Sequence, residues 1–218
     1  MRDSISYFLD LSDNEPLFYG TTRRVYRHPH DPALLVKVPS RQEEERRRAN
    51  RPAWKQRFKP TGIANITNLR EMAEIMRLNP EALPCPPHIF CFIGLVATNH
   101  GWGQIVKAER DAYGDYAPTL ESIAQDSSRY QKPLEKFIAW VKTAPIVLID
   151  LEPWNCVLAE RNGKQQIVLI DGMGEKTIIP LRTYFPSLNN KKNARQIDQF
   201  FNSLELVKQG KTPPRRRA

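Results

Sequence analysis

The sequence has 218 residues, 40% of them apolar, which suits one domain or two small lobes with a real hydrophobic core. Its formal net charge of +9 and pI of about 9.6 favour an anionic partner such as a nucleotide, a phosphorylated glycan, a nucleic acid or an acidic membrane surface. No run approaches the ~20 apolar residues of a membrane span, and the N-terminus lacks a signal-like apolar stretch, so we expect a soluble cytoplasmic protein; three cysteines without a CxxC pair favour the same reducing compartment.

The first part of the chain predicts strands followed by one helix. Residues 15–39 are typical of two short strands around the turn "HPHDP", and the second strand, "ALLVKV", is apolar except for Lys37. Residues 41–60 are highly charged and mostly basic, which fits either a solvated insertion or a patch for an anionic substrate. The apolar spacing of 63–80, with its final Asn-Pro, predicts an amphipathic helix.

The middle and the end of the chain predict a further strand pair and several helices. Residues 89–111 indicate a strand, a turn at 99–103 and a second strand. Helices are expected at about 119–126, 133–143 and 193–207. The buried stripe of the last helix is expected to comprise Ile197, Phe200, Phe201 and Leu204.

Two apolar runs each end in an aspartate. "VLID" ends at Asp150, "IVLID" ends at Asp171, and Asn155 lies between them. The segments "CVLAE" and "QQIVLID" flank "RNGK", and Asn-Gly between apolar runs is a strong β-hairpin signal. A hairpin brings its two ends together, so we expect these three polar residues to converge.

Two carboxylates and an amide oxygen form a hard oxygen site that suits Mg²⁺. Phosphoryl transfer needs such a site, together with a carboxylate that accepts the proton of the attacking hydroxyl and a cation on the phosphates. Asp150 can serve as the base, Asn155 and Asp171 as the metal ligands and Lys37 as the cation. Taken alone, Asp150 would be interpreted as a strand-end cap and Lys37 as a snorkelling edge lysine.

The same residues carry a resemblance to protein kinases. "DLEPWN", which begins at Asp150, resembles the catalytic loop H-R-D-L-K-P-x-N, and "DGMG", which begins at Asp171, resembles the D-F-G element. "LLVK", which ends at Lys37, resembles V-A-I-K, and "FYGTTRRV" resembles the glycine-rich loop but keeps only Gly20 and Val25. All four motifs occur in the kinase order, which favours the joint interpretation over the separate ones.

More narrowly, "VYRHPHDPALLVKVP", "TNHGWGQIVKAERDAYGDYAPTL" and "IDGMGEKTIIPLR" resemble the YrbL family, small bacterial kinase-like proteins assigned to the PhoP regulatory network, over roughly residues 16–185. The resemblance implies a two-lobed protein-kinase-like fold of the α+β class with a minimal C-terminal lobe. It implies ATP and Mg²⁺ as ligands but no established substrate. It favours Glu71, in "LREM", over Glu74 as the partner of Lys37, and it places Glu109 at the hinge whose backbone pairs with adenine.

The resemblance also implies the domain organisation. We expect a kinase-like N-terminal lobe over residues 1–109 that carries the basic insertion 41–60. A C-terminal lobe over 110–207 holds the catalytic loop and the metal-binding element, and 208–218 is a basic tail.

The sequence departs from the kinase pattern at several points. Glu152 stands where protein kinases keep a lysine on the transferring phosphate, and a negative charge there disfavours the transition state unless it points away. Phe18 and Arg23 replace two loop glycines, and Arg23 would either reach a phosphate or block the loop. The short chain after Asp171 argues against a conventional protein kinase.

Three functions follow as hypotheses. The first is an ATP-dependent phosphotransferase acting on a small-molecule or glycan hydroxyl in a bacterial regulatory or envelope-stress context, with an anionic acceptor such as a lipopolysaccharide core sugar. The second is a catalytically inactive pseudokinase or interaction module, favoured by Glu152 and the altered glycine loop. The third is a basic nucleic-acid binder, for which no recognised module is visible.

Overall fold

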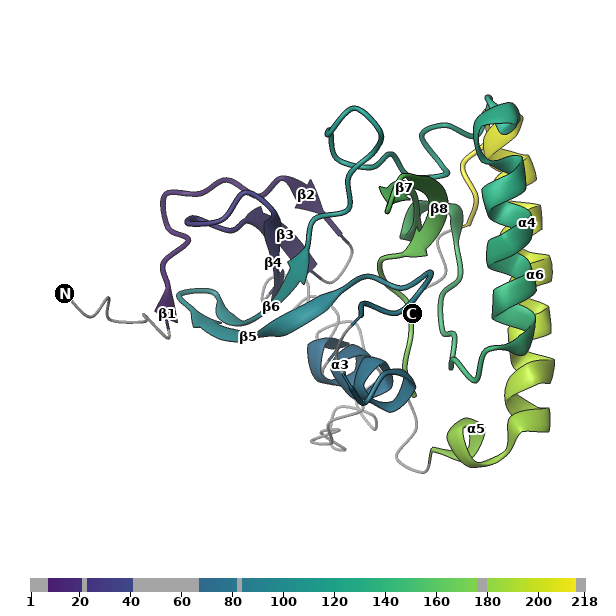
Figure 1. Ribbon diagram of the computed structural model, residues 1–218, viewed down its shortest axis with the longest axis horizontal. Helices are drawn as coiled ribbons and strands as arrows, with labels where there is room; N and C mark the ends of the chain where they lie inside the picture. Colours follow the sequence, from purple (N-terminus) through teal and green to yellow (C-terminus); the bar gives the residue numbers. More distant parts are fainter. Residues whose placement is uncertain (1–7, 21–22, 41–66, 82–83, 176–179, 215–218) are drawn as a thin grey trace, which may run out of the picture. The chain divides into compact units, whose positions relative to one another are not determined.

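The computed structural model describes residues 8–20, 23–40, 67–81, 84–175 and 180–214 (Figure 1). The chain forms two compact units, one of Met1–Thr61 with Cys91–Ala108 and the other of Gly62–Phe90 with Glu109–Ala218. The described elements are strands in the first unit and helices with one hairpin in the second, so the fold belongs to the expected α+β class. The basic segment 41–60 and the last residues of the tail lie outside the described residues.

The first unit contains a six-stranded sheet in the order β1-β5-β6-β4-β3-β2. Its strands are β1 (Phe8–Leu9), β2 (Phe18–Tyr19), β3 (Arg23–Arg27), β4 (Leu34–Pro39), β5 (Phe92–Thr98) and β6 (Gly101–Lys107). All neighbours pair antiparallel except β1, which is parallel to β5. The strands expected within 15–39 and 89–111 are thus confirmed, although β5 and β6 are joined by a turn shorter than predicted.

The two faces of this sheet differ in polarity because side chains alternate along each strand. Val25 on β3 lies opposite Lys37 on β4, which in turn lies opposite Gln104 on β6, so the three share one face. The other face carries a hydrophobic core made of Leu9, Leu11, Tyr26, Val36, Val38 and Val96. Register therefore places the predicted phosphate-binding lysine on the face away from this core.

The second unit combines helices with the predicted hairpin. Its elements are α3 (Thr67–Leu78), α4 (Ser127–Thr143), the 3₁₀ turn η2 (Pro153–Asn155), β7 (Cys156–Arg161), β8 (Lys164–Leu169), α5 (Leu181–Tyr184) and α6 (Pro186–Lys208). The hairpin is confirmed, with Asn162 and Gly163 both at positive φ, as the tight turn requires. Helix α4 packs on β8 and on α6, and Figure 1 shows α4 and α6 running side by side.

Several local predictions are wrong. Residues 119–126 form a series of turns rather than a helix, and α4 begins earlier than expected, with Pro133 inside it. Helix α6 begins at Pro186 instead of 193. The apolar run 147–150 is not a strand.

The three cysteines differ in bonding state. Cys85 and Cys91 are both disulfide-bonded and Cys156 is a buried free thiol, so the cysteine argument for a reducing compartment loses its basis. No helix among the described residues is long and apolar enough to cross a membrane.

The buried stripe of α6 allows a direct test, because two adjacent phenylalanines differ in exposure. Phe200 is 0% exposed, whereas Phe201, which was expected to be buried, is 44% exposed. We expect Phe200→Ala to lower the free energy of unfolding by about 3–5 kcal/mol, since it leaves a core cavity. Phe201→Ala is the matched control, with a loss below about 1 kcal/mol. Equal losses in urea unfolding would contradict the placement of this stripe.

Candidate functional site

The two ends of the hairpin lie against each other in the second unit. The N–H groups of Ile149 and Asp150 both donate to the Gly172 carbonyl, at 2.8 and 3.1 Å. The Ile170 N–H donates to the Asn155 carbonyl at 2.8 Å. These backbone bonds place the loop that precedes β7 beside the loop that follows β8, so the convergence expected of a hairpin is present.

The side chain of Asn155 is committed to Asp150. Its Nδ2 donates to the Asp150 carbonyl at 2.9 Å and to the Asp150 Oδ2 at 3.2 Å. The residue ends η2, where Pro153 occupies the first helical turn and its fixed φ favours the bend. Because the nitrogen of the amide is used in this way, its oxygen is the atom that remains for a metal.

Asp171 is followed by Gly172, at a position where only glycine fits. The Asp171 Oδ1 accepts a hydrogen bond from the Gly172 N–H at 2.6 Å. Gly172 has a φ of +89°, and a Cβ there would lie 2.4 Å from the Asp150 carbonyl oxygen. Gly174 has a φ of +95°, and its Cβ would lie 2.7 Å from the Arg70 carbonyl oxygen. Both glycines of "DGMG" thus permit close backbone packing.

The donor set at these loops fits a hard cation. Asp150 and Asp171 offer carboxylate oxygens and Asn155 an amide oxygen, the ligand types that Mg²⁺ prefers. Among the described residues no group of three or more His, Cys, Asp or Glu side chains could hold a metal. A magnesium ion at these residues would complete its coordination with water and phosphate oxygens.

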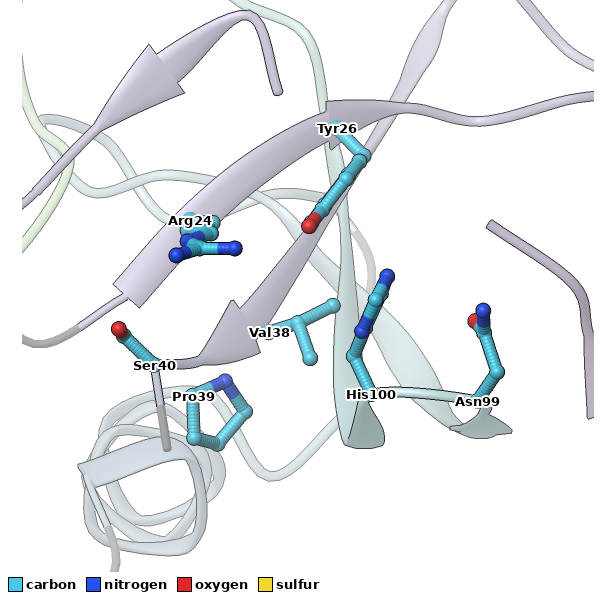
Figure 2. A pocket seen from close by; sticks show the side chains of 7 residues that line it. All are labelled: Arg24, Tyr26, Val38, Pro39, Ser40, Asn99 and His100. Atoms are coloured by element: carbon cyan, nitrogen blue, oxygen red, sulfur yellow. The ribbon is translucent and has the colours of Figure 1, made fainter. Parts of the chain in front are cut away.

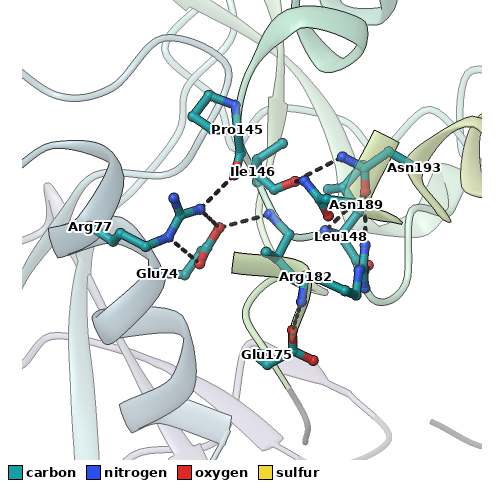
Figure 3. A network of polar contacts seen from close by, with 10 residues as sticks. Glu74, Arg77, Pro145, Ile146, Leu148, Glu175, Arg182, Asn189 and Asn193 are labelled. Atoms are coloured by element: carbon teal, nitrogen blue, oxygen red, sulfur yellow. Dashed lines mark hydrogen bonds and ion pairs between the residues drawn. The ribbon is translucent and has the colours of Figure 1, made fainter. Parts of the chain in front are cut away.

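The segment that leads into Asp150 is held by side chains from other elements (Figure 3). The Val147 N–H donates to the Glu74 Oε1 of α3 at 2.7 Å, and the Leu151 N–H donates to the Gln196 Oε1 of α6 at 3.0 Å. Side-chain oxygens therefore take the place of strand partners at Val147 and Leu151, while Ile149 and Asp150 donate to the Gly172 carbonyl. This explains why the apolar run 147–150 is not a strand although Val147 and Leu148 are buried.

The carbonyl groups of the same segment are satisfied in the same way. The Ile146 carbonyl accepts hydrogen bonds from the Nδ2 atoms of Asn189 and Asn193, each at 2.8 Å. The Leu148 carbonyl accepts one from the Arg182 Nη1 at 2.7 Å. Sequence reasoning missed these residues. Their signal is a polar stripe on α6 at positions 189, 193 and 196, spaced to share one helix face.

Arg182 contacts this segment and α6 at the same time. Besides the Leu148 carbonyl, its Nη2 donates to the Asn193 Oδ1 at 2.9 Å, and its backbone N–H donates to the Glu175 Oε2 at 3.3 Å. Burial lowers the pKa of Arg182, and the charges of Glu175 and Glu74 act in the opposite direction. An arginine remains charged under such a shift, so it is a fixed cation beside the segment 145–151.

The contacts of Glu74 bear on the choice between the two helix glutamates. Both Glu71 and Glu74 are buried. The Glu74 carboxylate pairs with Arg77, with Nη2–Oε1 at 2.6 Å, while also accepting the Val147 N–H. Glu74 is therefore engaged in holding the segment that leads into Asp150. The pairing of Lys37 with Glu71 stays a prediction.

In the first unit, Lys37 lies in the middle of the sheet and is only 7% exposed. Its neighbour on the same face, Gln104, is fully buried and accepts a hydrogen bond from the Arg23 Nη1 at 3.3 Å. Arg23 is thus tied to the sheet rather than extended into solvent. The Gly20 N–H donates to the Arg23 carbonyl at 2.8 Å, and Val25 is half-buried between the strands.

A pocket of about 270 Å³ lies on the opposite face of this sheet (Figure 2). It is lined by Arg24, Tyr26, Val38, Pro39, Ser40, Asn99 and His100. The rings of Tyr26 and His100 stack with centroids 5.6 Å apart. Since Tyr26 and Val38 alternate with Val25 and Lys37 along their strands, this pocket is not the predicted phosphate site.

Glu109 has a structural role through its side chain. Its carboxylate forms an ion pair with Arg161, whose Nε donates at 2.9 Å. Arg161 also donates to the carbonyls of Pro86 and Ile89, at 3.0 and 2.8 Å. The Glu109 carbonyl accepts the Ala117 N–H at 3.0 Å. The predicted contact of its backbone with adenine is a separate matter and stays a prediction.

Glu152 is 4% exposed, so it does not extend into solvent. Cys156 lies close to it, and burial together with the Glu152 charge raises the pKa of the Cys156 thiol. Cys156 is therefore an unreactive structural residue. A negative charge within the motif "DLEPWN" is the main electrostatic departure from the kinase pattern.

The comparison with known proteins establishes the family. The sequence model of the family described as PhoP regulatory network protein YrbL matches residues 9–205, and the chain belongs to this family. It is similar to the uncharacterized protein YrbL of Escherichia coli (strain K12), with 25% identity over 183 residues that cover 80% of this chain and 77% of the relative. The YrbL protein of Shigella flexneri gives the same values.

A solved structure also matches the chain. It is a double mutant of the PknI kinase domain of Mycobacterium tuberculosis, with a TM-score of 0.43 and 16% identity. The match covers 72% of this chain and 56% of the kinase domain, so the chain spans little more than half of that domain.

The close approach at Gly172 predicts a large effect of a single methyl group. Gly172→Ala should lower the free energy of unfolding by about 1–3 kcal/mol from its φ alone, with a further loss from the contact with Asp150. Gly163→Ala is the matched control, because Gly163 also has positive φ but nothing lies within 4 Å of its Cβ position. Equal losses for the two variants in denaturant unfolding would show that the close approach is absent.

The side-chain bonds to 145–151 predict a second stability effect. Asn193→Ala should cost about 2–4 kcal/mol, because it leaves buried groups of Ile146, Leu148 and Arg182 with fewer partners. Asn190→Ala, at an exposed position of the same helix, should change the stability by less than about 0.5 kcal/mol. A loss at position 193 no greater than that at 190 would contradict the role assigned to α6.

Proposed function

We propose that this YrbL-family protein binds ATP with Mg²⁺ and transfers a phosphoryl group to the hydroxyl of a small molecule or glycan. The observation that supports this most is that the loop of Asp150 and Asn155 is hydrogen-bonded to the loop that contains Asp171, because phosphoryl transfer needs a base and two oxygen ligands in one place. A regulatory or envelope-stress context in bacteria is part of the proposal, consistent with the family description.

Each residue has a proposed task. Asp150 accepts the proton of the attacking hydroxyl, and the Asn155 Nδ2 holds it in place through hydrogen bonds to its carbonyl and carboxylate. Asn155 and Asp171 hold the metal, which when bound offsets the negative charge of the phosphates. Lys37 contacts the phosphates, and Glu71 orients it.

The remaining nucleotide contacts are assigned by the motif resemblance. Gly20 and Val25 belong to the loop over the phosphates and the base, and the backbone of Glu109 contacts adenine. An anionic acceptor, such as a lipopolysaccharide core sugar, fits the net charge of the chain. Nucleic acid is not part of this proposal.

A second function, a pseudokinase or interaction module, is favoured by two observations. Glu152 is buried beside the catalytic-loop motif, where a negative charge opposes phosphoryl transfer. Arg23, which replaces a glycine of the phosphate loop, is bonded to Gln104 instead of projecting from the loop. Both features are compatible with nucleotide binding without turnover.

The first test is thermal unfolding with ATP, with and without Mg²⁺. A ligand that binds the native state raises the unfolding midpoint, so the wild type should show a Mg²⁺-dependent rise. Asp171→Asn should lose the Mg²⁺-dependent part, because an amide is a poorer ligand for the cation than a carboxylate. Asp198→Asn, at an exposed position of α6, should behave as the wild type.

Turnover then distinguishes the two functions. Asp150→Asn should keep the midpoint rise but release ADP about 10²–10⁴-fold more slowly, as expected for loss of a general base. A midpoint rise without any ADP release from the wild type would favour the pseudokinase. No rise in any variant at millimolar ATP would reject nucleotide binding altogether.

A further inference from the structure

An apolar corner is exposed where α5 meets α6. Leu181 is 46% exposed, Tyr184 71%, Phe185 56% and Leu188 41%. The four residues lie within eight positions of the chain, and hydrogen bonds from the Phe185 N–H to the Leu181 carbonyl and from the Leu188 N–H to the Phe185 carbonyl hold them together. Single exposed apolar residues need no explanation, but a cluster marks a contact surface.

Basic side chains follow this corner along the exposed side of α6. Lys191, Lys192 and Arg195 lie three, four and seven positions after Leu188, so they continue the same helix face. All three are exposed, and within the described residues their side chains form no ion pair or hydrogen bond. By contrast, the side chain of Arg182 is hydrogen-bonded to the Leu148 carbonyl in the segment 145–151.

The charge of this region is one-sided. Residues 181–197 contain four basic residues, at 182, 191, 192 and 195, and no Asp or Glu. An exposed apolar cluster beside unneutralised cations has the composition of an interfacial membrane contact, with Tyr, Phe and Leu entering the headgroup region and Lys or Arg meeting anionic headgroups. An acidic protein surface would pair with the basic side chains equally well, but it would bury less of the apolar surface of Tyr184 and Phe185.

We propose that the corner formed by Leu181, Tyr184, Phe185 and Leu188, together with Lys191, Lys192 and Arg195, docks on an anionic phospholipid surface. The contact is peripheral, since no described helix is able to span a bilayer. It does not depend on nucleotide binding or turnover. The chemistry recognised is a negatively charged bilayer interface, not a particular lipid.

The test is flotation of the purified full chain with vesicles of phosphatidylcholine, alone or mixed with phosphatidylglycerol. We expect binding to the anionic vesicles only, weakened at high salt because the Debye length falls. Lys191→Glu with Lys192→Glu should lower the partition coefficient by at least about 25-fold, at about fivefold per basic residue near an anionic surface. Tyr184→Ser with Phe185→Ser should lower it by at least about tenfold, because both aromatic side chains leave the interface.

Matched controls separate this surface from general attraction by the basic chain. Lys132→Glu with Lys136→Glu reverses two exposed charges on α4, and Tyr113→Ser removes a tyrosine that is 87% exposed elsewhere in the second unit. Both controls should keep wild-type binding, and thermal unfolding should show that all variants are folded. The proposal is overturned if the wild type ignores anionic vesicles, if the controls lose as much binding as the corner variants, or if the aromatic substitutions have no effect.

Discussion

The backbone of residues 145–151 is the constraint on which the second unit depends. This segment is largely buried, and within the described residues its backbone is hydrogen-bonded to another segment's backbone only at 172–174, so its remaining N–H and C=O groups need other partners. Glu74, Asn193, Gln196 and Arg182 are among the side chains that supply them. A buried group without a partner costs about 1–3 kcal/mol, so α3, α5 and α6 are bound to the segment that ends at Asp150. The position of the predicted base is therefore set by residues far from it in the sequence.

The hairpin and the convergence at its base could be predicted because they depend on short-range rules. Asn-Gly selects a tight turn, the turn fixes the register, and the register places Cys156 opposite Leu169. The residues that flank this pair, Asn155 and Ile170, are then necessarily adjacent. The position of Lys37 within the sheet follows in the same way, from a turn between two short strands and from alternation along β4.

Other features could not be predicted because their causes are tertiary. An apolar run such as 147–150 has the same composition whether a strand or a set of amides satisfies its backbone, and the amides lie about forty residues later on α6. The hydrogen bond from the Val147 N–H to the Glu74 carboxylate joins two segments that are distant in the sequence, so it could not be predicted either. Burial of Phe201 was predicted from helix periodicity, which does not show where a neighbouring element stops covering the helix face.

Helices α5 and α6 connect the segment 145–151 with the exposed apolar and basic surface, because each helix carries residues that contact the segment and residues that are exposed. Arg182 and Asn193 turn inward and hold the segment before Asp150, whereas Tyr184 and Lys191 lie on the outside of the same helices. Close-packed interiors transmit strain, so a contact that shifts α6 also strains its hydrogen bonds to that segment. Such a link becomes allosteric only if the contact favours one position of the helix over another. The hydrogen bonds of Arg182 and Asn193 would carry such a preference to the segment that ends at Asp150.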